Sequence, residues 1–93
     1  MKGTEITPKV REKVYERDSF EGAPCCILCG RPYPEVHHVI SRGAGGKGIE
    51  QNLVCLCYRC HKRYHATGDK GMKKAMIDYL KKYYPEWEES EMK

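Results

Sequence analysis

The stretch that decides the fold runs from Glu35 to His65 and reads EVHHVISRGAGGKGIEQNLVCLCYRCHKRYH. It opens with two adjacent histidines in a short β-branched run and closes with two histidines one helical turn apart. Between them lie a glycine-rich loop, one asparagine before an apolar run, and a Cys-x-x-Cys pair. All 4 histidines of the 93-residue chain fall in this stretch, so we expect the rest of the chain to support it.

The local sequence predicts two strands and a helix here. Residues 35–40 are rich in β formers, and the apolar run at 52–56 is expected to be the returning strand. The glycines of 41–48 predict a wide loop between these strands. The second Cys-x-x-Cys, at 57–60, should lead into a helix over 61–66 that Gly68 ends.

The cysteines indicate a structural metal site. A domain of 93 residues has a modest core, and a bound metal often adds the missing stability. Two Cys-x-x-Cys pairs supply the thiolates of a closed tetrahedral zinc site. Its predicted ligands are Cys26, Cys29, Cys57 and Cys60. Cys25 is an alternative to Cys26 in a longer loop, and we expect Cys55 to pack as a small apolar side chain.

The histidines indicate a second, catalytic metal site. His61 and His65 share one helix face and can reach the same ion. Neighbouring strand residues point to opposite faces, so only one of His37 and His38 easily joins them. Three imidazoles leave coordination positions open for water or substrate, as catalytic ions require.

This order of motifs resembles the HNH endonuclease family, the ββα-metal nucleases. The resemblance rests on H-H-V-I, G-A-G-G and N-L-V-C-L-C-Y-R-C-H-K-R-Y-H, about a third of the chain, and the Cys-x-x-Cys pairs resemble the zinc-stapled branch. It implies that His38 is the general base and that Asn52 braces the loop and the segment carrying that base. It also implies a catalytic divalent ion (Mg²⁺, Mn²⁺, Ni²⁺ or Zn²⁺) held by His37, His61 and His65.

The flanking sequence predicts one α+β domain over residues 1–93, with a ββα-metal core at 25–66. Thr7 and Pro8 are typical of a helix start, and a helix over about 8–18 would keep Arg17 among its surface charges. A second helix over about 71–84 carries a Met/Tyr stripe that favours core packing, and Pro85 should stop it. We expect residues 1–6 to be loose and the acidic tail 85–93 to be mobile, unless Trp87 docks onto the body.

The charge favours a polyanionic partner. The net charge is +4 although the tail PEWEESEMK is acidic, so the body of the chain is more basic than the total. Exposed lysines and arginines are also ordinary surface residues. The candidate contacts to DNA phosphates are Arg42, Lys47, Arg59, Lys62 and Arg63.

The expected function is metal-dependent DNA cleavage, by nicking or double-strand cutting, with weak sequence preference and, as the resemblance implies, 5′-phosphate and 3′-hydroxyl ends. A homodimer through the Met/Tyr stripe would turn a nickase into a double-strand cutter. The family also implies a phage or prophage context with packaging or recombination proteins as partners. No signal-like or membrane-spanning segment is visible, which favours a cytoplasmic protein and no membrane partner. The alternatives are a non-enzymatic zinc module that binds nucleic acid or protein, and a degenerate nuclease retained for binding.

Overall fold

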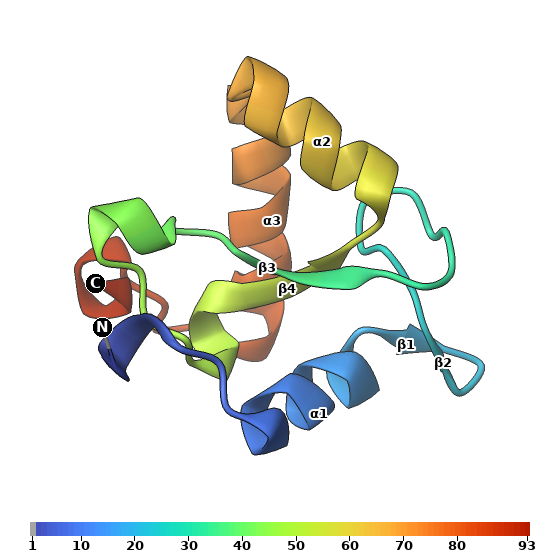
Figure 1. Cartoon of the computed structure of the whole chain (residues 1–93), viewed down its shortest axis with the longest axis horizontal. Helices are drawn as coiled ribbons and strands as arrows, with labels where there is room; N and C mark the ends of the chain where they lie inside the picture. Colours follow the sequence, from blue (N-terminus) through green and yellow to red (C-terminus); the bar gives the residue numbers. More distant parts are fainter. Residues whose placement is uncertain (1) are drawn as a thin grey trace.

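The computed structural model describes residues 2–93, and its centre is a β-hairpin followed by a helix (Figure 1). Strands β3 (Glu35–His38) and β4 (Leu53–Leu56) pair in antiparallel fashion. Helix α2 (Tyr58–Thr67) follows β4 almost directly. The predicted α+β class with a small ββα core is therefore confirmed.

Two further helices cover the hairpin. Helices α1 (Pro8–Arg17) and α3 (Lys70–Tyr83) are the expected terminal helices. All four residues of β4 are buried, because its alternate side chains enter two different apolar clusters. One cluster holds Val14, Leu53 and Cys55, and the other includes Val54, Leu56, Met76 and Leu80. The buried part of the Met/Tyr stripe is thus used within the chain.

Helix α2 begins earlier than the sequence predicted. Cys57 is its N-cap, and the Cys57 sulfur accepts a hydrogen bond from the backbone N–H of Cys60 at 3.4 Å. The prediction that the helix starts at His61 was wrong, because the second Cys-x-x-Cys is itself the first turn of the helix. Gly68 ends α2 in a left-handed conformation, as predicted.

A buried ion pair between Arg17 and Asp18 joins helix α1 to the hairpin and to α3. Arg17 binds Asp18 through two nitrogens and also donates to the carbonyls of Glu50 and Leu53. Asp18 accepts from the Cys55 backbone N–H at 2.9 Å and from the Tyr79 hydroxyl at 2.6 Å. Our sequence interpretation of Arg17 as a surface charge was wrong, since its side chain connects the end of α1 to β4 and to the aromatic residues of α3.

Both ends of the described chain pack onto the body, unlike the loose ends expected from the sequence. The short 3₁₀ turn Lys2–Thr4 lies against the glycine-rich loop, where the Gly48 N–H donates to the Gly3 carbonyl at 2.9 Å. In the tail, the Trp87 indole N–H donates to the Gln51 carbonyl at 2.7 Å, and Met92 is buried. Trp87 therefore docks, as the alternative prediction allowed; Met1 lies outside the described residues.

The remaining elements are short. Strands β1 (Ser19–Phe20) and β2 (Ala23–Pro24) form a small hairpin after α1. Three further 3₁₀ turns cover Arg42–Ala44, Glu50–Asn52 and Glu89–Met92. Within residues 2–93, every helix is too short or too polar to cross a membrane.

Candidate active site and metal centres

Four cysteines gather beside the ββα core. The ligand atoms of Cys26, Cys29, Cys57 and Cys60 all lie within 4.8 Å of one another. The Cys29 and Cys57 sulfurs are 3.4 Å apart, and all four thiols are free. The loop before β3 supplies one pair, and the first turn of α2 supplies the other.

Local hydrogen bonds shape this cluster. The Gly30 N–H donates to the Cys26 carbonyl and the Cys26 N–H donates to the Arg31 carbonyl, both at 2.9 Å, which closes the first knuckle. Burial raises the pKa of Cys57, but the Cys60 N–H and the neighbouring thiols outweigh it and lower that pKa to about 7. Four converging sulfurs, one of them readily ionised, fit a tetrahedral metal such as zinc.

The two remaining cysteines lie outside the cluster. The Cys25 thiol lies 3.7 Å from the Asp18 carbonyl oxygen, so Cys26 is the member of this adjacent pair that joins the other three. Cys55 is fully buried in β4, and burial together with the Asp18 carboxylate raises its pKa to about 12. A thiol held neutral in this way behaves as a small apolar side chain.

His37 and His61 come together on one side of β3. Their ring centroids are 4.8 Å apart in an edge-on arrangement, and the Tyr64 ring centroid lies 5.5 Å from that of His37. The Nε2 atom of His37 is buried and has no hydrogen-bond partner among residues 2–93. Burial and the neighbouring histidines lower the pKa of His37 to about 4, so the ring is neutral at neutral pH and one of its two nitrogens carries a free lone pair. An unpartnered buried imidazole nitrogen fits a divalent ion.

Glu35 and His65 complete the surroundings of His61. The Glu35 carboxylate lies 3.3 Å from Nδ1 of His61, which leaves Nε2 of that ring for an ion. A shallow hollow of about 290 Å³ lies beside His61, and the exposed His65 lines it together with His61 and Glu35. Among residues 2–93, only the cysteine cluster brings at least three His, Cys, Asp or Glu ligand atoms within 4.8 Å. The structure therefore brings His37 and His61 together, whereas His65 is exposed and shares only the hollow beside His61.

His38 makes a contact that the sequence did not reveal. Its Nε2 lies 2.9 Å from the Thr4 carbonyl oxygen, so this nitrogen carries the proton and donates it to that oxygen. Partial burial and the positive charges of Arg42 and Arg11 lower the His38 pKa, although the hydrogen bond to Thr4 opposes this. The ring is thus neutral near pH 7, with Nδ1 left as a proton acceptor.

Asn52 spans the glycine-rich loop. Its side chain is fully buried, accepts from the Ile40 N–H at 2.9 Å and donates to the Ile40 carbonyl at 3.1 Å. It also donates to the Lys47 carbonyl at 2.9 Å. These three bonds fix the end of the segment that carries both β3 histidines.

The predicted DNA contacts differ in their positions. Arg59, Lys62 and Arg63 are exposed on α2, and Arg42 is exposed in the loop close enough to His38 to influence its pKa. Lys47 is half-buried, and its backbone N–H donates to the Met92 carbonyl at 2.7 Å. The four exposed cations lie on the elements that surround the histidines.

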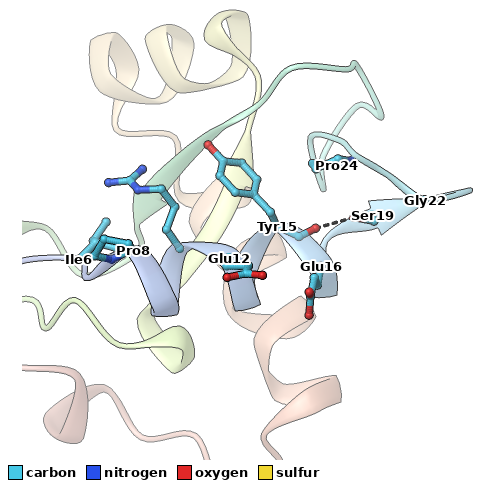
Figure 2. A pocket seen from close by; sticks show the side chains of 9 residues that line it. Ile6, Pro8, Glu12, Tyr15, Glu16, Ser19, Gly22 and Pro24 are labelled. Atoms are coloured by element: carbon cyan, nitrogen blue, oxygen red, sulfur yellow. Dashed lines mark hydrogen bonds between the residues drawn. The ribbon is translucent and has the colours of Figure 1, made fainter.

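A larger hollow, of about 630 Å³, lies elsewhere along α1 (Figure 2). Its lining includes Arg11, Tyr15, Glu16 and Pro24 but neither histidine nor cysteine. Ser19 bonds to the Tyr15 carbonyl at its edge (Figure 2). This hollow is therefore separate from both the cysteine cluster and the histidine site.

The sequence interpretation missed Glu35, Tyr64 and Thr4. Glu35 lies two residues before His37 and so on the same strand face, a spacing that was visible in the sequence. Tyr64 lies three residues after His61, which was also a usable signal. Thr4 is 34 residues from His38, and nothing in the local sequence marks their contact.

Comparisons with known proteins identify related sequences and a related fold. A family model for HNH endonuclease matches residues 26–67. The chain is 44% identical over 45 residues to the type IV methyl-directed restriction enzyme EcoKMcrA of Escherichia coli K12, which covers 48% of this chain and 16% of that enzyme. It is 30% identical over 59 residues to anaredoxin of Nostoc sp., which covers 61% of this chain and 72% of that protein.

A solved structure shares the fold. The type IV phosphorothioation-dependent restriction endonuclease ScoMcrA superposes with a TM-score of 0.61 at 21% identity, over 87% of this chain and 17% of that one. This chain thus spans about a sixth of each restriction enzyme that it matches. No name among these three relatives refers to a phage, so the phage context stays a prediction. The family match and the shared ββα fold agree: the chain belongs to the HNH endonuclease family.

Proposed function

We propose that this chain is a metal-dependent endonuclease that hydrolyses DNA phosphodiester bonds. The observation that carries the proposal is that the two adjacent histidines of β3 have different surroundings. His37 has a buried, unpartnered Nε2 and its ring lies 4.8 Å from that of His61, while His38, the next residue, has Nε2 bonded to the Thr4 carbonyl and Nδ1 free. An ion site and a neutral base on neighbouring residues are what one-metal phosphodiester hydrolysis needs.

In this proposal His37, His61 and the more exposed His65 hold the catalytic ion, and Glu35 orients the His61 ring. The bound ion (Mg²⁺, Mn²⁺, Ni²⁺ or Zn²⁺) supplies positive charge to the scissile phosphate and to the departing 3′ oxygen. Nδ1 of His38 takes a proton from the attacking water, while Thr4 keeps the other nitrogen protonated. The products carry a 5′-phosphate and a 3′-hydroxyl.

The remaining predicted residues support this chemistry. Asn52 holds the loop that follows β3 and so keeps His38 in place. The four cysteines hold a structural zinc that joins the loop before β3 to the start of α2. The exposed cations Arg42, Arg59, Lys62 and Arg63 contact backbone phosphates, whereas Lys47 contributes less because it is half-buried. Phosphate contacts carry no base information, which agrees with weak sequence preference.

DNA as substrate is supported by the relatives. Two of them are named as restriction enzymes or restriction endonucleases, although the chain spans only a sixth of each. The open hollow beside His61 and His65 favours a catalytic ion over a closed structural one. A purely binding zinc module would have no use for a neutral base beside such a site.

The direct test is cleavage of a supercoiled plasmid by the wild-type protein with each of the four ions added in turn. We expect conversion to the nicked circle with at least one ion. A folded, zinc-loaded protein that leaves the plasmid intact with every ion would contradict the proposal and favour the binding module. Linear product at low enzyme concentration would indicate paired active sites.

Gly48 gives a second test, because it holds the segment that contacts His38. A methyl group at Gly48 would collide with the Glu5 carbonyl, whereas a methyl at Gly43 in the same loop would meet nothing within 4 Å. We expect Gly48→Ala to displace Thr4 from His38 and to lower the nicking rate by about 10²-fold, the cost of misplacing a catalytic group by about 1 Å. Gly43→Ala is the matched control, and equal rates for the two variants would contradict the role of this segment.

A further inference from the structure

Two exposed tyrosines next to the cysteine cluster have no role in the chemistry described above. Tyr33 is 92% exposed and Tyr58 is 66% exposed, and each lies close in sequence to a cysteine of the cluster, Cys29 and Cys57 respectively. Both line one shallow hollow of about 320 Å³ together with Arg31 and Arg59. We call Arg31, Tyr33, Tyr58, Arg59 and Lys62 the tyrosine surface.

The backbone of Tyr33 adopts a conformation that is unfavourable for a residue with a side chain. Its φ is 58°, in the left-handed region that non-glycine residues rarely adopt, and it lies between Pro32 and Pro34. A large ring in such a conformation, with almost its whole surface in water, gains nothing from packing. Strained exposed residues of this kind concentrate at binding sites.

Tyr58 connects this hollow to the candidate ion site. It also lines the neighbouring hollow with Glu35, His61 and His65, so the two hollows share its ring. The Lys62 ammonium lies 5.7 Å from the centre of that ring. The tyrosine surface therefore begins beside the proposed catalytic ion and extends across the outside of the knuckles toward Tyr33.

The charged residues of the tyrosine surface indicate which kind of partner it binds. The tyrosine surface carries two arginines and one lysine, and the one acidic residue lining either hollow is Glu35, which faces His61. Cations interleaved with exposed aromatic rings suit a chain that alternates phosphates and flat bases. Within a duplex both faces of each base are covered by its neighbours, so rings can stack only on unpaired bases.

We propose that the tyrosine surface binds unpaired nucleotides of a DNA strand next to the phosphodiester bond that is cleaved. The inference rests on the proposed function and narrows its substrate to DNA with a single-stranded segment, such as an overhang, a flap or a locally unwound part of a supercoiled plasmid. Tyr58 stacks on the base nearest the ion site and Tyr33 on a more distant one. Arg31, Arg59 and Lys62 bind the intervening phosphates.

The test measures binding separately from cleavage. His38→Ala protein with its zinc retained is titrated with three fluorescently labelled DNAs of one sequence: a single strand, a blunt duplex, and a duplex with a single-stranded overhang. Fluorescence anisotropy then compares this parent with Tyr33→Asn and Tyr58→Ala made in the same background. Asparagine tolerates the left-handed backbone at position 33. Phe20→Ala is the matched control, since Phe20 is 71% exposed but lies on β1, outside the surface.

We expect each tyrosine variant to weaken binding of the single strand and of the overhang DNA by about 5- to 150-fold, the range for loss of one stacked base. Blunt-duplex binding, Phe20→Ala and the ring-preserving Tyr58→Phe should match the parent. Equal losses on duplex and single strand would overturn the proposal. So would undiminished single-strand binding, which would leave the surface to a protein partner. If the tyrosine variants show these losses but the wild type cleaves neither the plasmid nor the overhang DNA with any ion, the nuclease function itself is rejected.

Discussion

Replacing His38 with alanine is expected to lower the rate of plasmid nicking by about 10²–10⁴-fold, the usual contribution of a general base. The loss should appear in the chemical step and not in DNA binding, because His38 is set apart from the exposed cations of α2. The fold should survive, since the ring is only half-buried and its Nε2 bonds a single backbone carbonyl, that of Thr4. Single-turnover nicking at saturating DNA measures this effect.

The control for this prediction is metal content. His38→Ala should bind both ions as the wild type does, because the predicted ligands are the cysteines, His37, His61 and His65. Unchanged nicking by a variant with full metal content would remove His38 from the mechanism. If the variant lost both its activity and the ion proposed at the histidines, His38 would be a metal ligand and not the general base.

The largest effect on stability is expected for Cys57→Ser. A structural zinc contributes about 10–16 kcal/mol to folding, which is comparable to the total stability of about 5–15 kcal/mol typical of a domain. Serine at position 57 can still cap α2 through its hydroxyl, so the expected loss comes from removing the sulfur that lies 3.4 Å from Cys29. We expect the variant to lose cooperative thermal unfolding and its zinc, measured by calorimetry and metal analysis.

Cys25→Ser is the matched control for that experiment. Cys25 is adjacent to Cys26 in sequence, but its thiol faces the Asp18 carbonyl and lies outside the cluster. It should retain zinc and unfold near the wild-type temperature. A Cys57→Ser protein that unfolds as cooperatively as Cys25→Ser would show that the cluster does not stabilise the fold.

Much of this fold could be predicted because its signals are local. Thr7 caps α1 by accepting from the Val10 N–H at 3.2 Å, as the Thr-Pro pair indicated. Paired Cys-x-x-Cys spacing predicted which four sulfurs meet, since a knuckle fixes its own geometry. Strand alternation separated His37 from His38 for the same reason, because it depends only on neighbouring residues.

The rest depends on contacts between distant parts of the chain. Thr4 reaches His38 only because the glycine-rich loop carries Gly48 against the amino-terminal segment. Arg17 looks like one more surface charge until α1 is packed on β4, where its partners come from residues far along the chain. Trp87 docks on Gln51 in the same way. No periodicity or spacing rule encodes such pairings, because they exist only after the elements have packed.

The glycine-rich loop has one further consequence, for the connectivity of the chain. Its Gly48 N–H holds Gly3, and the Lys47 N–H holds the Met92 carbonyl, so neighbouring residues of one loop grip both ends of the described chain (Figure 1). Ends that lie so close can be joined by a short linker at little entropic cost. The exposed turn at Glu21 and Gly22, which connects β1 and β2, is then a suitable position for the new chain termini. The packing is thus compatible with a circularly permuted order of the same elements.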